Sequence, residues 1–216
     1  MKPQLIRIKD LATNEFKDIR DKQPGVYIVF WIKDGKPVLI RRICGEDQRG
    51  TLYIGSSKNL RKELRGLWES IEIAAGKKRY KRKKLPHTLG PSLIYTGLFQ
   101  HIRDEDLWIY FKEFATSKEA EDQERRALLE YSRMFGEPPP LNLQVGREYF
   151  LILGLGRLSK SRLAPKLDPD LKSALGISPL KRPLITTCQI CLILYPPHHS
   201  LFSTALAWDL WNPLSK

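Results

Sequence analysis

The segment TLYIGSSKNL (51–60) joins a short apolar strand to a run of small polar residues. The strand ends at Gly55, a residue that permits a close approach to the backbone. Ser56, Ser57 and Asn59 then offer hydroxyl and amide groups and the N-terminus of a predicted helix, which together suit an anion. The pattern therefore indicates that some group comes close to the chain at this glycine.

The charge balance also favours an anionic partner. The 216 residues include 37 Lys and Arg against 24 Asp and Glu, a net charge of +13. Such an excess attracts polyanions, with nucleic acid first and an anionic membrane surface second. The three cysteines imply no disulfide framework, which favours a reducing cytoplasm. No uninterrupted apolar stretch reaches the roughly 20 residues of a bilayer span, so we expect no membrane partner.

Residue periodicity predicts the elements that would position this segment. Two runs of Val, Ile and aromatic residues flank Asp34-Gly35, which predicts a hairpin over 25–43. Further strands are expected at 52–56 and 106–114, and capped helices at 59–75 and 116–135. The fold class is therefore α/β in the α+β sense: a small, mainly antiparallel sheet flanked by helices, with a basic C-terminal extension. We place one domain at 1–150 and a linker with the extension at 151–216.

Two tripeptides on neighbouring predicted strands carry a family resemblance. Gly25-Val26-Tyr27, followed by Tyr53-Ile54-Gly55, resembles the two half-motifs that name the GIY-YIG nuclease family. Glu130 followed by Asn142 is similar to the family's Glu-bearing helix and distal Asn, at the interval seen in its excision-repair and restriction members. The segment GPSLIYTG (90–97) is also similar to family sequence. The resemblance covers about residues 25–142.

The resemblance implies a DNA endonuclease that hydrolyses phosphodiester bonds with Mg²⁺ or Mn²⁺. It implies that Glu130 holds the metal ion, a role that suits Mg²⁺, which takes one or two carboxylates. It implies that Tyr27 and Tyr53 position the attacking water and relay its proton. Because a phenol has a pKa near 10, the phenolate needs a nearby cation. Gly55 would then admit the phosphate, and Asn142 would either support the helix and metal shell or simply cap a turn.

One position departs from the family pattern. Glu63 stands where the family usually has an Arg that steadies the scissile phosphate, and a carboxylate there adds repulsion. Arg61 and Arg65 lie on the far side of the predicted helix, since each residue turns it by about 100°. Either Arg79 or Arg82 supplies the cation, or cleavage is weak or absent and Glu63→Arg would increase it. This departure motivates the alternative of a non-catalytic nucleic-acid-binding protein on a decayed nuclease fold.

The basic loop KKRYKRKK (77–84) is expected to contact phosphates, because seven of its eight residues are Lys or Arg. His87 follows it, and a turn histidine is favoured there over a site residue. The predicted phosphate- and DNA-binding residues are Gly55, Ser56, Lys58, Lys77, Lys78, Arg79, Lys81, Arg82, Lys83 and Lys84.

The C-terminal tail is harder to interpret. Cys188, Cys191, His198 and His199 are four potential zinc ligands, but their spacing is short for a zinc finger, so packing roles are favoured. The uncharged end with Trp208 and Trp211 raises a third hypothesis, a protein that acts through tail-mediated interactions.

Overall fold

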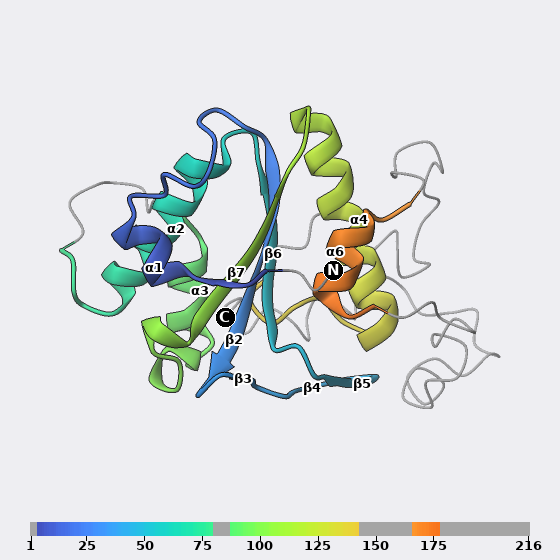
Figure 1. Ribbon diagram of the computed structural model, residues 1–216. Coiled ribbons are helices and arrows are strands. Elements are labelled where there is room, and N and C mark those ends of the chain that lie inside the picture. The colour runs from blue at the N-terminus through green and yellow to red at the C-terminus, as the bar shows by residue number, and fades with distance from the viewer. Residues whose placement is uncertain (1–3, 80–86, 143–165, 178–216) are drawn as a thin grey trace, which may run out of the picture.

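The computed structural model describes residues 4–79, 87–142 and 166–177 (Figure 1). In chain order the elements are β1 (Ile6–Arg7), α1 (Ile8–Thr13), β2 (Gly25–Lys33), β3 (Lys36–Pro37), β4 (Ile40–Arg42), β5 (Gly45–Asp47), β6 (Thr51–Ser57), α2 (Leu60–Ala74), α3 (Leu89–Tyr95), two 3₁₀ turns (Leu98–Gln100 and Asp104–Asp106), β7 (Leu107–Glu113), α4 (Ser117–Phe135) and α6 (Pro169–Leu175).

The main sheet is built around β2, which pairs antiparallel with β6 on one side and β7 on the other. β1 extends the sheet beyond β7, and β3 returns along the end of β2. Asp34 and Gly35 have φ values of 51° and 74°, so the predicted turn is confirmed as one with two left-handed residues. The second strand of this hairpin is shorter than predicted. Residues 40–42 leave the sheet and pair instead with β5 in a small separate hairpin.

Helices cover both faces of the sheet (Figure 1). Along β2, Val26, Ile28 and Phe30 face α4 and α6, whereas Tyr27 and Val29 face α1, α2 and α3. This alternation follows from the period of two in a strand, which sends successive side chains to opposite faces. The predicted class, a mixed α+β fold with an antiparallel sheet and flanking helices, is confirmed.

The two long helices begin and end within one residue of the predicted bounds. The Asn59 side chain accepts a hydrogen bond from the Lys62 N–H at the start of α2, and the Thr116 hydroxyl accepts one from Glu119 at the start of α4. α4 ends at Gly136, whose φ of 78° suits glycine. The helices α1, α3 and α6 were not predicted, because six or seven residues carry too little periodicity.

Residues 166–177 pack against the sheet domain. The Lys112 Nζ on β7 lies 2.8 Å from Asp168 and 2.7 Å from Asp170, and Leu171 and Leu175 of α6 are buried with α4. The predicted boundary near 150 lies outside the described residues, as does the tail from 178 onward. This part of the predicted extension belongs to the core. None of the described helices is long and apolar enough to cross a membrane.

This packing leads to a stability prediction. Leu171 is fully buried, so Leu171→Ala should lower the free energy of unfolding by about 2–5 kcal/mol, measured by urea denaturation. The matched control is Ser173→Ala, on the exposed side of the same helix, which should change it by less than about 0.5 kcal/mol. Equal effects of the two substitutions would show that α6 does not contribute to the core.

Candidate active site

The two motif tyrosines meet over Gly55. In the sheet register Tyr27 on β2 lies opposite Gly55 on β6, and the ring of Tyr53 stacks on that of Tyr27 with centroids 5.9 Å apart. A Cβ at Gly55 would lie 2.7 Å from Tyr27 Oη and 2.7 Å from Tyr53 Cε1. The group that comes close to this glycine is therefore a pair of aromatic rings. Gly55 was expected to make room for a phosphate. In the structure, glycine is needed at this position because a side chain would collide with the two tyrosine rings.

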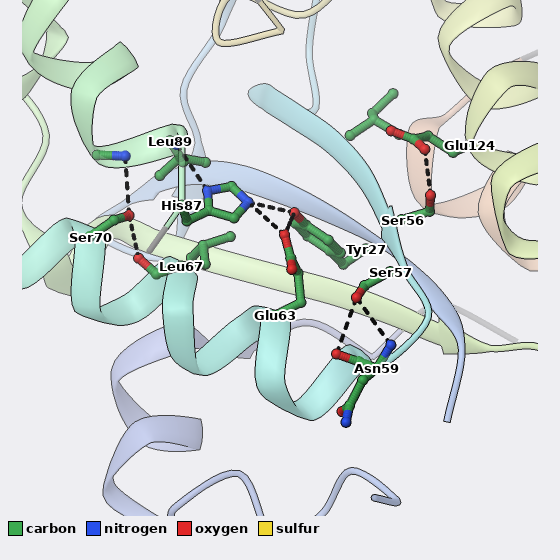
Figure 2. Close-up of polar contacts among 12 residues, drawn as sticks. Tyr27, Ser56, Ser57, Asn59, Glu63, Leu67, Ser70, His87, Leu89 and Glu124 are labelled. Carbon is green, nitrogen blue, oxygen red and sulfur yellow. Dashed lines mark hydrogen bonds and ion pairs between the residues drawn. The ribbon is translucent and has the colours of Figure 1, made fainter. Parts of the chain in front are cut away.

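The Tyr27 hydroxyl enters a polar cluster beneath α2 and α3. Its Oη lies 2.7 Å from His87 Nε2, and the Glu63 carboxylate lies 3.2 Å from that nitrogen and 3.5 Å from the Tyr27 oxygen (Figure 2). Tyr27 and His87 are almost completely buried, whereas the Glu63 side chain is 34% exposed. The sequence favoured a turn histidine at 87. The residue does precede α3, but its side chain contacts the motif tyrosine.

The helix phase expected for position 63 is confirmed. Arg61 and Arg65 point away from the cluster, where they donate hydrogen bonds to the backbone carbonyls of Ile19 and Glu15. Neither arginine therefore faces the tyrosines, whereas the Glu63 carboxylate contacts the Tyr27 hydroxyl.

A hydrogen bond to His87 Nδ1 determines the protonation of this imidazole. The backbone N–H of Leu89 donates to Nδ1 at 2.9 Å, so this nitrogen carries a lone pair. In the neutral ring the proton is then on Nε2. It points at the Tyr27 oxygen and the Glu63 carboxylate, and Nε2 consequently has no lone pair to offer a metal ion.

Glu124 lies across β6 from this cluster. Its carboxylate accepts a 2.5 Å hydrogen bond from the Ser56 hydroxyl, and Ser56 pairs with Val26, whose side chain is on the α4 face (Figure 2). Burial raises the pKa of Glu124, and the bond from Ser56 offsets this in part. Its charge nevertheless acts on the tyrosines, because the negative carboxylate helps to raise the pKa of both Tyr27 and Tyr53.

Glu130, the predicted metal ligand, lies elsewhere on α4. Its carboxylate is 2.8 Å from Arg126 and 3.6 Å from Arg133 on the same helix. Six residues rotate it about 120° from the direction of Glu124, at about 100° per residue. No contact among the described residues therefore brings Glu130 together with the tyrosines, whereas the charge of Glu124, on the same helix, acts on both of them.

Asn142 joins the end of the α4 loop to β6. Its side-chain amide donates to the Ile54 carbonyl at 2.7 Å and accepts from the Ile54 N–H at 2.9 Å. This pair of bonds satisfies both backbone groups of a buried strand residue, next to Tyr53. Asn142 was expected to support the helix and metal shell or to cap a turn; in the structure its side chain instead holds the strand that carries the second motif.

The predicted phosphate-binding residues are only partly described. Lys77 pairs with Asp104 at 2.7 Å and Lys78 with Glu69 at 3.4 Å. Arg79 and Lys58 are exposed. The other loop residues, Lys81, Arg82, Lys83 and Lys84, lie outside the described residues, as do Cys188, Cys191, His198, His199, Trp208 and Trp211.

Both tyrosines are neutral phenols in this arrangement. Burial raises the pKa of Tyr27 well above its usual value, and Tyr53, Glu63 and Glu124 raise it further. Burial also raises the pKa of Tyr53. A phenolate at either position would need a positive charge nearby to offset these effects.

The donor set suits one hard cation held mainly by solvent. No group of three or more metal-ligating His, Cys, Asp or Glu side chains occurs within residues 4–79, 87–142 and 166–177. Mg²⁺ needs only one or two carboxylates and keeps several waters. Glu124 fits that role because its partly buried carboxylate has a single neutral hydroxyl donor, Ser56, as its hydrogen-bond partner among the described side chains.

The chain matches no model of a known protein family, no curated protein and no solved structure.

The contact at Gly55 can be tested directly. Gly55→Ala should displace the Tyr27 ring and lower the free energy of unfolding by about 1–3 kcal/mol in urea denaturation, because the buried ring has no room to move. The cost should shrink when Tyr27 is already replaced by Ala, since the two changes share one contact. Additive effects in this double-mutant cycle would contradict the proposed crowding.

Proposed function

We propose that the chain is a divalent-metal-dependent endonuclease that hydrolyses phosphodiester bonds in DNA. The observation that carries this proposal is the stacking of two tyrosines from adjacent strands, with the carboxylate of Glu124 across β6 near enough for its charge to raise the pKa of both. The GIY and YIG half-motifs supply those tyrosines. The net charge of +13 supports a polyanionic substrate, and the low cysteine content suits the cytoplasm.

Each group has a distinct part in the proposed reaction. Glu124 would hold the metal ion, which supplies positive charge at the phosphate oxygens and lowers the pKa of water. Tyr53, which is only partly buried, would orient the attacking water through its hydroxyl oxygen. Tyr27, whose buried hydroxyl lies against His87, stacks on Tyr53 and limits the directions in which that ring can turn. Asn142 fixes the strand from which Tyr53 projects.

A second candidate is a nucleic-acid-binding protein without catalysis. Glu63 favours it, because this carboxylate adds negative charge close to Tyr27, where a phosphate would have to approach. Cleavage of plasmid DNA in Mg²⁺ or Mn²⁺ separates the two candidates. Binding without metal-dependent cleavage would establish the second.

The first functional prediction compares two glutamates on one helix. Glu124→Gln should reduce the rate of plasmid nicking about 100-fold or more, because the amide removes the charge that holds the cation. Glu130→Gln, the matched control, should stay within about threefold of wild type, since its carboxylate pairs with arginines away from the tyrosines. DNA affinity and thermal stability are measured for both variants.

Two outcomes would contradict this assignment. Full activity in Glu124→Gln would remove the proposed metal site. A loss confined to Glu130→Gln would restore the ligand implied by the family resemblance.

The second functional prediction concerns the basic loop, defined as residues 77–84. Replacing its seven Lys and Arg residues by Ala should weaken binding to all DNA sequences alike and make the slope of log affinity against log salt shallower. Lys77 and Lys78 already have carboxylate partners, so replacing only these two should change the slope less than replacing the other five. An unchanged slope in the full variant would show that the loop contacts no phosphates.

A further inference from the structure

The outward side of α3 is apolar. Pro91, Ile94 and Tyr95 are three and four residues apart, so they lie on one side of this helix. Tyr95 is 85% exposed and Ile94 is 57% exposed, the two highest values among the large hydrophobic side chains that the structure describes. The solvent side of a helix is normally polar, whereas residues 88–100 contain no Asp, Glu, Lys or Arg. This side of α3 therefore offers a flat aromatic ring and an apolar neighbour to a ligand.

The helix that carries Tyr95 is firmly held. The backbone N–H of Gly90 donates to the Ser70 hydroxyl of α2 at 3.2 Å, and a Cβ at Gly90 would collide with the Ser70 backbone. On its inner side α3 buries Leu89 and Leu93 in the core. Tyr95 is thus presented on a fixed backbone, which reduces the conformational entropy lost when a ligand binds.

The helix begins at the candidate active site. The Leu89 N–H donates to His87, whose other ring nitrogen contacts the hydroxyl of Tyr27. From Leu89 to Tyr95 the helix rises about 9 Å, at 1.5 Å per residue. Successive nucleotides of one stacked strand follow at about 3.4 Å, so this rise corresponds to about three nucleotides. Tyr95 can therefore contact the same DNA strand as the motif tyrosines.

Positive charge precedes this helix in the chain. Lys84, the last residue of the basic loop, and Leu89 are five residues apart, a span of at most about 18 Å in an extended chain. Proteins that bind single strands combine basic residues along the phosphates with exposed aromatic rings on which the bases stack. In the interior of a duplex both faces of a base are covered by its neighbours. An exposed tyrosine beside a basic loop therefore suits an unpaired base.

The size of the apolar area also favours a base over a protein. A stable protein interface buries about 800 Å² on each partner, more than one tyrosine and one isoleucine side chain can supply. A single stacked base needs only the face of one ring. The area and the nearby charge thus agree on a nucleotide as the occupant.

We propose that Tyr95 stacks on an unpaired base of the DNA, bordered by Ile94, about three nucleotides from a phosphate held at the motif tyrosines. This rests on the proposed function and gives the class of its substrate, DNA with unpaired nucleotides next to the cleaved bond. Tyr95 determines which DNA structures bind and has no contact with the reacting atoms.

The experiment measures binding of the full chain to fluorescent DNA without divalent metal. The two ligands are a duplex and the same duplex with a gap of about six nucleotides in one strand. Tyr95→Ala should bind the gapped DNA about 5- to 150-fold more weakly, the range of one base–aromatic contact, and the duplex as wild type does. Tyr95→Phe should keep the affinity, because a phenyl ring also stacks. Ile43→Ala is the matched control, since it removes another exposed apolar side chain, between β4 and β5.

Two further measurements distinguish stacking from phosphate contact. Abasic nucleotides are placed one at a time opposite the gap, and at one of these positions the effect of Tyr95→Ala should disappear, because no base is left to stack. The slope of log affinity against log salt should be the same in Tyr95→Ala as in wild type, since a stacked ring displaces no counterions.

Several results would overturn the inference alone. They are wild-type affinity of Tyr95→Ala for gapped DNA, or an equal loss in Tyr95→Phe. Unchanged affinity with lower thermal stability would show that another segment of the chain covers this side of α3, and a lower mass in light scattering would show that a second copy does. The expected Tyr95 effects without metal-dependent cleavage by wild type would overturn only the proposed nuclease function. Absence of any DNA binding by wild type would overturn both.

Discussion

The close approach of two tyrosine rings to Gly55 is the contact on which the rest of the site depends. Tyr27 is directly opposite this glycine on a strand buried on both faces, so its ring can lie across β6 only where no side chain stands. With the ring in that place, the phenol oxygen reaches His87 and the second motif tyrosine stacks beside it. The two half-motifs therefore need each other for packing, before any substrate is considered.

The site concentrates groups that destabilise one another. Glu63, Glu124 and the two phenols all disfavour further negative charge, and burial adds to the effect. A protein selected only for stability would fill this space with apolar side chains, because buried ionisable groups cost free energy unless they are well paired. The whole chain, in contrast to this negative cluster, has a net charge of +13. A negative cluster within a positive protein suits a site that binds a cation together with a polyanion.

The sequence was most informative where structure is decided locally. The Asp34-Gly35 turn, the Asn59 and Thr116 caps and the Gly136 stop depend on a few adjacent residues, and all were predictable.

The choice between Glu124 and Glu130 depended on the rotation of α4 against the sheet. Ala120, Ala127 and Tyr131 form its buried face, and Glu124 lies on the same face at helical spacing. That pattern was a readable signal, whereas nothing near His87 in the chain revealed that it would meet a tyrosine 60 residues away.

The local hydrogen bonds also explain why a carboxylate fits position 63. Leu89 obliges His87 to present an N–H toward α2, and a donor in a buried place needs an acceptor. An arginine at position 63 would place five further N–H donors near the His87 N–H. The other His87 tautomer, with its proton on Nδ1, would point that proton at the Leu89 N–H. With the Tyr27 oxygen accepting the imidazole N–H, Glu63 is the carboxylate placed nearest to the phenol O–H. A carboxylate at position 63 thus fits the hydrogen bonds set by the Leu89 backbone and the imidazole, whereas an arginine would add only donors.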